Sequence, residues 1–411
     1  MTTLILNKFK SHPLYLFSDF RKLFLGRLIA AIGDKFYMIA LAWWIVSMDN
    51  SNSKMHLGLL MGVTSLPVVI FGPFLGTLAD RFNKKYCMLA ADLLRFLLLL
   101  TLSGLLFSDN LTMPLLYLIS FLTAAFIPLF EASVSSSLVR LTDEEHLPGA
   151  VAVDSSVMQL SNVIGSTLGT VLIAAIGVIG AFVWNSASFL ISFIFVLMIK
   201  TKLQPAQSDS ESKYTDDLKE GFKYLFQNKP IFYLLIFFAL LNFFAAPFLI
   251  LIPMIVKFNL NESATWLAVF EVFFALGAVI TSLVVSFKHK YHNIYALFFS
   301  AICVMGAILT AISFTSDKYL IAGLIFLNGC CLALTNAIAI TLFQSIVPDE
   351  MKGRFFALLS TVCFAVMPVA FMLNGFITEI YSVNFSLMFN GLCSIVLSFV
   401  LLFIPKIKSS L

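Results

Sequence analysis

The feature that most limits the fold is a series of long apolar segments along almost the whole chain. The hydrocarbon core of a bilayer is about 30 Å thick, so a crossing helix needs about 20 mostly apolar residues. The 411-residue sequence has twelve such segments, at residues 20–48, 58–79, 86–107, 113–137, 150–176, 181–199, 230–256, 264–287, 294–315, 319–346, 355–380 and 384–404. Backbone groups in lipid must be satisfied within the segment, which only a helix achieves here. The pattern predicts an all-α membrane protein with twelve transmembrane helices.

Composition supports the membrane class and excludes several partners. Charged residues make up 12% of the chain and hydrophobic residues 60%, whereas soluble domains average about 25% charged residues. A net charge of +4 with no long basic run argues against nucleic acid as a partner. The six cysteines show no C-x-x-C or Cys/His spacing. We therefore expect no disulfide, no metal site and no cofactor.

Positive charge is distributed unevenly between the two sides of the predicted helices. If both termini are cytoplasmic, 20 of the 26 Lys and Arg residues fall in cytoplasmic segments, 3 in outer loops and 3 inside spans. Lys and Arg accumulate on the cytoplasmic side of membrane proteins. The sequence predicts a multi-pass protein of the inner (plasma) membrane with both termini in the cytoplasm.

One long polar connection separates the sixth span from the seventh. Within it Tyr214, Leu218, Phe222 and Leu225 recur at helical spacing, which predicts an amphipathic helix on the cytoplasmic membrane surface. The connection divides the spans into two groups of six. The expected domains are an N-terminal six-helix bundle, a linker and a C-terminal six-helix bundle, at residues 1–199, 200–229 and 230–411.

A short repeat relates the two halves. Asp143-Glu144 follows the fourth span, and Asp349-Glu350 follows the tenth, 206 residues later. A repeat across six helices places both halves the same way up in the membrane. Transporters built from two such parallel repeats bind substrate between them, near the middle of the bilayer.

The connection between the second and third spans reads Gly76-Thr-Leu-Ala-Asp80-Arg81-Phe-Asn83-Lys84-Lys85. It resembles the loop signature G-x-L-x-D-R-x-G-R-K of the major facilitator superfamily. Asn83 replaces the usual glycine, and because asparagine tolerates a left-handed backbone we expect the turn to be kept. The resemblance implies that Asp80 faces the start of the eleventh helix. Together these loop residues would form a cytoplasmic latch that opens as the two halves move: Gly76, Asp80, Arg81, Lys84 and Lys85.

Further matches point to one branch of that superfamily. Gly33-Asp34, Asp92-Leu-Leu-Arg95 and the segment 347–354 are similar to the macrolide-efflux and enterobactin-exporter branch. The resemblance implies the major facilitator fold and a protein that works as a monomer. Drug/proton antiporters often carry a Gly-Pro pair in the fifth helix, which this chain lacks although Gly165 and Gly169 keep a close-packing spacing.

Ionisable side chains inside spans are candidates for function, because each costs about 2.5–3.5 kcal/mol at a helix centre on insertion scales. Asp34 lies near mid-membrane and is the first candidate for proton coupling or for binding a substrate cation, with a structural ion pair as the alternative. Arg27 and Arg95 are its possible partners, and Asp92 can pair with Arg95 three residues away. Glu271 is the candidate from the second half.

Other polar residues in the spans have a weaker claim. Glu131 and Asp154 lie nearer cytoplasmic helix ends, where contacts with solvent or the latch are favoured over a functional role. Amide side chains inside spans must each find a hydrogen-bond partner. We expect most of them to bond between helices and a minority to line a cavity: Gln159, Asn162, Asn242, Asn328, Asn336 and Asn374.

These observations predict a secondary active transporter rather than an enzyme. The first hypothesis is a proton-coupled exporter of small amphipathic molecules, such as drugs or siderophores, that works by alternating access. The alternative is a lysophospholipid transporter or flippase on the same fold. A membrane enzyme or a non-transporting sensor is a remote third, because the sequence has no Walker loop, H-E-x-x-H motif, nucleophile elbow or metal cluster.

The predicted orientation is testable with reporter fusions. Green fluorescent protein fused after Ser208 should fluoresce, and alkaline phosphatase fused there should be inactive, because its disulfides form only outside the cytoplasm. Fusions after Asn110, in an outer loop, should give the reverse pattern. Active phosphatase at Ser208 would contradict the predicted topology.

Overall fold

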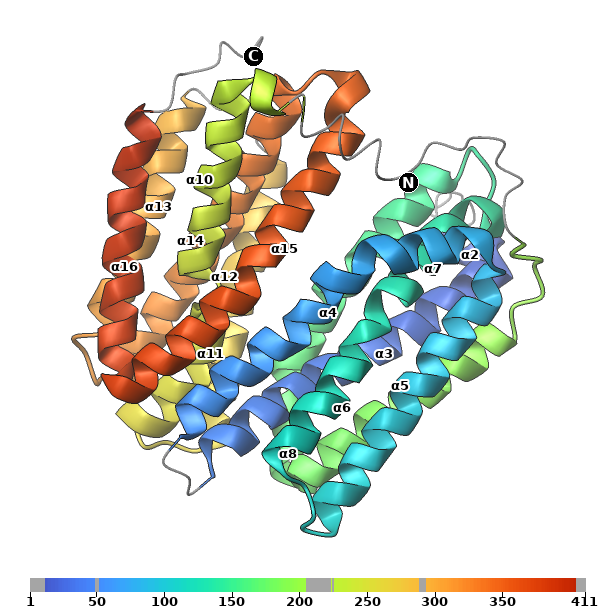
Figure 1. Ribbon diagram of the computed structural model, residues 1–411, viewed down its shortest axis with the longest axis horizontal. Coiled ribbons are helices and arrows are strands. Elements are labelled where there is room, and N and C mark those ends of the chain that lie inside the picture. Colours follow the sequence, from blue (N-terminus) through green and yellow to red (C-terminus); the bar gives the residue numbers. More distant parts are fainter. Residues whose placement is uncertain (1–11, 49–51, 205–222, 224, 288–292, 404–411) are drawn as a thin grey trace, which may run out of the picture. The chain divides into compact units, whose positions relative to one another are not determined.

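The computed structural model of the chain describes residues 12–48, 52–204, 223, 225–287 and 293–403. All regular secondary structure in these ranges is helical (Figure 1). Eleven helices in the described ranges are long and apolar enough to cross a membrane. The all-α membrane fold predicted from the apolar segments is confirmed.

The N-terminal half contains six long or medium helices and one short one. They are α2 (Pro13–Leu16), α3 (Ser18–Val46), α4 (Ser53–Arg81), α5 (Lys84–Phe107), α6 (Met113–Ala125), α7 (Ile127–Leu141) and α8 (Leu147–Leu197). Helices α6 and α7 together form one membrane-length segment, Met113–Leu141. Pro128 lies in the first turn of α7, where its missing N–H breaks no hydrogen bond within that helix.

Helix α8 accounts for the difference between twelve predicted spans and eleven qualifying helices. It runs for 51 residues, but Gly177 inside it has φ 69° and ψ −178°, which is not a helical conformation. Glycine adopts this backbone without steric cost. The interruption falls between the predicted spans 150–176 and 181–199, and only Ile176–Leu197 counts among the eleven.

The C-terminal half begins with a broken span and continues with five long helices. They are α10 (Lys229–Ala245), α11 (Phe248–Met254), the π-helix η1 (Ile255–Asn259), α12 (Ala264–Ser286), α13 (Ile294–Ile312), α14 (Lys318–Ile346), α15 (Asp349–Ile380), α16 (Val383–Val400) and the 3-10 turn η2 (Leu401–Phe403). Pro247 separates α10 from α11, because it supplies no N–H to the carbonyl four residues earlier.

Contacts divide the chain into two compact units. Unit 1 comprises residues 1–41 and 66–210, and unit 2 comprises residues 42–65 and 211–411. The predicted domain boundaries at 199 and 230 stay a prediction. The amphipathic helix expected in the linker falls mostly on residues 205–222 and 224, outside the described residues.

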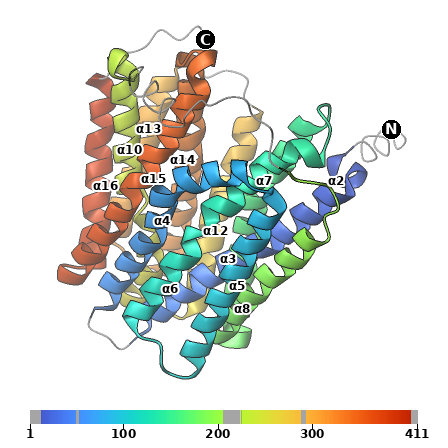
Figure 2. The ribbon, with the colours of Figure 1, turned by 45° about the vertical axis from the view of Figure 1, so that its right-hand side comes forward.

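Each unit has its own apolar core. In unit 1, α5 lies against α7 and α8 (Figures 1 and 2). The apolar core of this unit includes Phe20, Met88 and Phe130. In unit 2, α13 packs against α14 and α16, and the core includes Phe298 and Phe343. Interdigitated side chains of this kind hold helices together in lipid, where the hydrophobic effect between helices is absent.

Two glycines allow α12 and α14 of unit 2 to approach closely. A Cβ atom on Gly277 would lie 2.1 Å from the carbonyl oxygen of Phe326, and one on Gly329 would lie 2.2 Å from that of Phe274. Neither side chain is possible without moving a backbone. The crossing therefore depends on the absence of side chains on both helices.

This crossing generates a stability prediction. Gly329→Ala should destabilise the protein by about 1–3 kcal/mol, because the added methyl group separates α12 from α14. Gly323 on the same helix has open space around its Cβ position, so Gly323→Ala should be neutral or slightly stabilising through helix propensity. Melting temperatures of the purified proteins measure both effects, and equal melting temperatures for the two variants would contradict the close crossing.

Candidate functional site

An ion pair at the centre of unit 1 joins the first and third spans. Arg95 on α5 donates from Nη2 to Asp34 Oδ2 on α3 at 2.8 Å. Asn185 on α8 donates from Nδ2 to the other carboxylate oxygen at 3.2 Å. The guanidinium group lies over the Phe189 ring, 3.9 Å from its centroid. Three helices therefore meet at one carboxylate.

Asp92 has a different environment from the one considered in the sequence. Its side chain is fully buried, and Ser192 Oγ on α8 donates to its Oδ2 at 2.6 Å. Asp92 Oδ1 and Arg95 Nε have no hydrogen-bond partner in the described part of the chain. Arg95 is thus directed to Asp34 on the neighbouring helix, and Asp92 is left with a serine.

Arg27 forms the second charged group of unit 1. It donates from Nη2 to Glu131 Oε2 of α7 at 2.5 Å, and from Nη1 to Asp154 of α8. Its side chain is 8% exposed, against 46% for Glu131. Of the two partners considered for Asp34, the structure brings Arg95 to it and turns Arg27 toward Glu131 and Asp154.

Three residues of α8 complete the cluster without having been predicted from the sequence. They are Asn185, Phe189 and Ser192. Their spacing of four and three residues places them on one helical face. In the sequence, the only hint of this contact face was the presence of two polar residues, Asn185 and Ser192, on the same side of an apolar helix.

The predicted latch motif lies at the junction of α4 and α5. Arg81 is exposed, and the surroundings of Gly76 and of the Asp80 side chain lie outside the described part of the structure. Asn83 has φ −64° and ψ 116°, and its Oδ1 accepts from the backbone N–H of Lys85 at 3.0 Å. The expectation of a left-handed turn at Asn83 is wrong, because the residue is the extended N-cap of α5, a position that asparagine favours.

The two lysines of the motif contact the end of α8. Lys85 Nζ donates to the carbonyl oxygens of Leu197 at 2.9 Å and Ile199 at 2.6 Å. The backbone N–H of Lys84 donates to the carbonyl oxygen of Leu203 at 3.0 Å. Cations are favourable beside the free carbonyls of a helix C-terminus. The predicted latch contact with the start of α15 stays a prediction.

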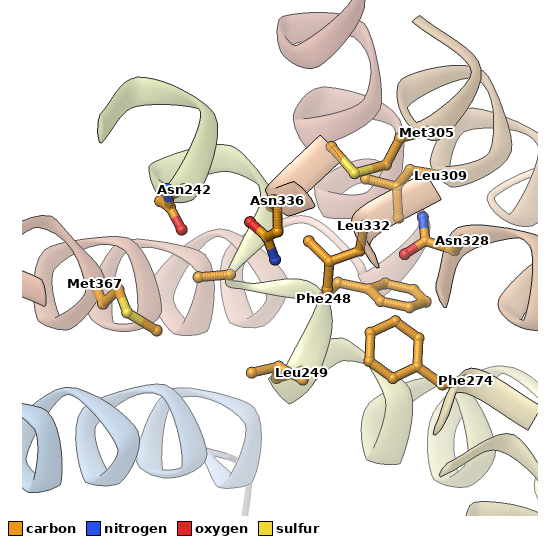
Figure 3. A pocket seen from close by; sticks show the side chains of 12 residues that line it. Asn242, Phe248, Leu249, Phe274, Met305, Leu309, Asn328, Leu332, Asn336 and Met367 are labelled. Carbon is orange, nitrogen blue, oxygen red and sulfur yellow. The ribbon is translucent and has the colours of Figure 1, made fainter. Parts of the chain in front are cut away.

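Unit 2 contains a cavity of about 150 Å³, which Figure 3 shows from close by. It is lined by Asn242, Ala245, Ala246, Phe248, Leu249, Phe274, Met305, Leu309, Asn328, Leu332, Asn336 and Met367. Glu271 is a partly buried residue of α12 and is not among these lining residues. Its predicted role in the second half stays a prediction. Three of the six amides noted in the spans line this cavity: Asn242, Asn328 and Asn336.

The structure has helices long enough to cross a membrane, ion pairs inside apolar segments and a cavity within one helical unit. These features are typical of a polytopic transport protein. The sequence of the chain agrees with this class over most of its length, since residues 23–371 match the family model of the Major Facilitator Superfamily. The chain belongs to this superfamily and is a multi-pass membrane transporter.

Curated relatives cover nearly the full chain at low identity. Macrolide efflux protein A of Streptococcus pyogenes is 23% identical over 95% of this chain and 96% of its own length. Macrolide efflux protein A of Enterococcus faecalis is 25% identical over 74% of this chain and 95% of its own length. The MFS-type transporter YfiS of Bacillus subtilis is 26% identical over 93% of this chain and 92% of its own length.

Solved structures of transporters share the fold. The nucleoside transporter NupG superposes with a TM-score of 0.77 at 14% identity, covering 95% of this chain and all of that one (100%). A bacterial homologue of the iron transporter ferroportin gives a TM-score of 0.71 at 16% identity, covering 93% of this chain and 98% of that one. At such identities the likeness concerns the fold alone.

The Asp34–Arg95 pair can be tested by removing one or both charges. Arg95→Leu should destabilise the protein by about 1–3 kcal/mol, because it leaves Asp34 without its cation in a partly buried site. The double variant Asp34→Leu/Arg95→Leu should recover part of this loss, since the carboxylate that lost its cation is then removed as well. Arg140→Leu, at an exposed arginine of α7, is the matched control and should change little. If the effects of Asp34→Leu alone and Arg95→Leu alone add up to that of the double variant, the pair contributes nothing.

Proposed function

We propose that this protein is a proton-coupled exporter of small amphipathic molecules, located in the plasma membrane with both termini in the cytoplasm, and that it works as a monomer by alternating access. The observation that carries the proposal is that the spans of unit 1 hold four carboxyl groups and two guanidinium groups, which together are called the charge cluster. Arg95 pairs with Asp34, Arg27 pairs with Glu131 and Asp154, and Asp92 is hydrogen-bonded to a serine. The members are Arg27, Asp34, Asp92, Arg95, Glu131 and Asp154.

The cluster holds more carboxyl groups than cations in an apolar setting. A carboxylate without a counter-charge is unfavourable away from water and becomes neutral when it takes up a proton. Proton binding is therefore the simplest way to balance this cluster. Ionisable residues inside a membrane protein mark proton relays and substrate paths more often than structural sites.

Asp34 is the proposed coupling carboxylate. Its side chain is 36% exposed, so a proton can reach it, whereas its partner Arg95 is 8% exposed. A proton on Asp34 removes the charge that attracts Arg95 and so weakens the contact between α3 and α5. Protonation would in this way favour a different arrangement of the helices around Asn185, which is what alternating access requires.

The direction and the substrate class come from similarity. Two of the relatives are named for macrolide efflux, and the motifs in the first and third spans resemble the same branch. A macrolide is a large, mostly apolar molecule with many neutral oxygens, which fits the proposal of an amphipathic substrate. In this proposal Asp80 and its neighbours Gly76, Arg81, Lys84 and Lys85 act as the cytoplasmic latch.

Transport by purified protein tests the proposal. In proteoliposomes with an imposed pH gradient, the wild type should accumulate radiolabelled erythromycin. Asp34→Asn should abolish this gradient-driven transport while the protein stays folded, because an amide cannot carry the proton. Asp143 lies in the exposed connection between α7 and α8, so Asp143→Asn is the control and should transport normally.

Three outcomes would change the proposal. Unchanged gradient-driven transport by Asp34→Asn would remove Asp34 from the mechanism and leave Glu131 and Asp154 as the coupling candidates. Transport that ignores the pH gradient in the wild type would rule out proton coupling. Uptake of labelled lysophospholipid in place of erythromycin would favour the lipid transporter considered in the sequence.

A further inference from the structure

Two complementary polar atoms of α5 are left without hydrogen-bond partners in unit 1. Asp92 is fully buried and Arg95 is nearly so. The acceptor Asp92 Oδ1 and the donor Arg95 Nε have no partner in the described part of the chain. The two residues are three positions apart, which makes them neighbours on one face of the helix. Buried polar groups in folded proteins are almost always satisfied, and each of these atoms is the kind of partner that the other lacks.

A neutral carboxylic acid fits the surroundings of Asp92 better than a carboxylate does. The group has a hydrogen bond with Ser192 at Oδ2, over 2.6 Å, and its Oδ1 is closed to water. Its neighbour Arg95 is bound through Nη2 to Asp34 at 2.8 Å. A carboxylate without a bound cation is unfavourable away from water and becomes neutral by taking up a proton. With the proton on Oδ2, the acid donates to the serine hydroxyl and leaves only a carbonyl oxygen unpaired.

The titratable groups around Asp92 come from several helices. Arg95 of its own helix and Asp34 of α3 act on it electrostatically. Of the helices packed against α5, α8 contributes a serine hydroxyl, and α7 contributes Glu131, whose charge acts on Arg95. Helix α6 has Tyr117 as its one titratable side chain. Arg95 is therefore a cation that lies beside both aspartates in this part of the structure.

The face of α8 that covers these groups supports an exchange between them. Asn185 donates to Asp34 at 3.2 Å, and Ser192 bonds to Asp92 at 2.6 Å. Between these two residues of α8 lies Phe189, whose ring centroid is 3.9 Å from the guanidinium group. The arginine can turn from one aspartate to the other while it stays over the ring, so the exchange keeps the cation–π contact.

We propose that Asp92 is a second proton site of unit 1 and that Arg95 switches between Asp34 and Asp92. In the structure, Asp34 is ionised and bound to Arg95, and Asp92 holds a proton. In the alternative arrangement, the O–H bond of Asp92 is broken, an O–H bond forms at Asp34, and the arginine turns to the ionised Asp92. The two carboxyl groups share one proton and one cation in both arrangements, so the net charge is unchanged.

The switch changes which helices the arginine holds together. Bound to Asp34, Arg95 links α5 to α3, whereas bound to Asp92 it bonds within α5. The proton at Asp34 therefore gains a second effect, because it directs the arginine as well as neutralising one carboxylate. The use of this exchange in transport rests on the proposed function, but the exchange itself does not require transport.

The C=O stretching band of a protonated carboxyl group reports the state of Asp92. Infrared spectra of the purified full-length protein at neutral pH, in a detergent without carbonyl groups, measure this band. The wild type should show a carboxylic acid band that Asp92→Asn lacks, because an amide replaces the acid without changing its shape. Asp143→Asn, at an exposed carboxylate paired with His146, is the control and should leave the band unchanged.

Removing the carboxylate of Asp34 distinguishes a switch from a buried acid that stays fixed. In Asp34→Asn the arginine has lost its partner and should turn to Asp92, which then ionises, so the Asp92 band should disappear at the same pH. The double variant Asp34→Asn/Arg95→Leu removes the cation as well, and the band should return. A purely structural acid would keep its band in Asp34→Asn.

Two results would overturn the switch. They are a wild-type spectrum without a band that depends on Asp92, and a band of full intensity in Asp34→Asn. If Asp92→Asn does not fold, the loss of the band in Asp34→Asn and its return in the double variant decide the question. This pattern without erythromycin transport leaves the switch standing and the proposed function wrong, whereas transport without this pattern leaves the proposed function standing.

Discussion

Lipid supplies no hydrogen bonds and no counter-ions, so every polar group inside the spans must be satisfied by another part of the protein. In unit 1 this constraint is met by charges. Both oxygens of Asp34 are held, one by Arg95 and one by Asn185, and the guanidinium group of Arg95 is covered by Phe189. Because these contacts come from α3, α5 and α8, a change of charge at one carboxyl group alters the packing of three helices at once.

Unit 2 meets the same constraint with neutral groups. Asn374 Oδ1 accepts from Ser386 Oγ at 2.7 Å and from Asn390 Nδ2 at 2.5 Å, and Asn374 Nδ2 donates to the carbonyl oxygen of Ala370 at 3.0 Å. The Asn374 oxygen therefore joins α15 to α16, and its Nδ2 bonds within α15. Asn328 is similarly buried in the wall of the cavity, but its Nδ2 has no hydrogen-bond partner in the described part of the chain.

The sequence predicts the fold well because each span carries its own signal of about 20 apolar residues, and even the interruption at Gly177 falls between two predicted spans. The pairing of polar side chains is harder to predict from the sequence, since each charged residue has several possible partners at similar depth in the membrane. Arg27 and Arg95 were both possible partners of Asp34, and the choice depends on how each helix is rotated against its neighbours. The contacts of Asn185 and Ser192 depend on the same rotation. Asn83 was misread because a family pattern suggested a turn, where the local pattern of an asparagine before a helix indicates an N-cap.

Side chains of two other helices hold the end of α8 within unit 1. Asp19 Oδ2 accepts from the backbone N–H groups of Lys200 and Thr201 at 2.9 and 2.8 Å, and Lys22 Nζ donates to the carbonyl oxygen of Met198 at 3.0 Å. Lys85 binds the carbonyls of the same helix end from α5. The end of α8 and the residues that follow it are thus bound to α3 and α5 by side chains of both helices. Lys85, one cation of the family motif, therefore contributes to the packing of unit 1, whereas Arg81 is exposed.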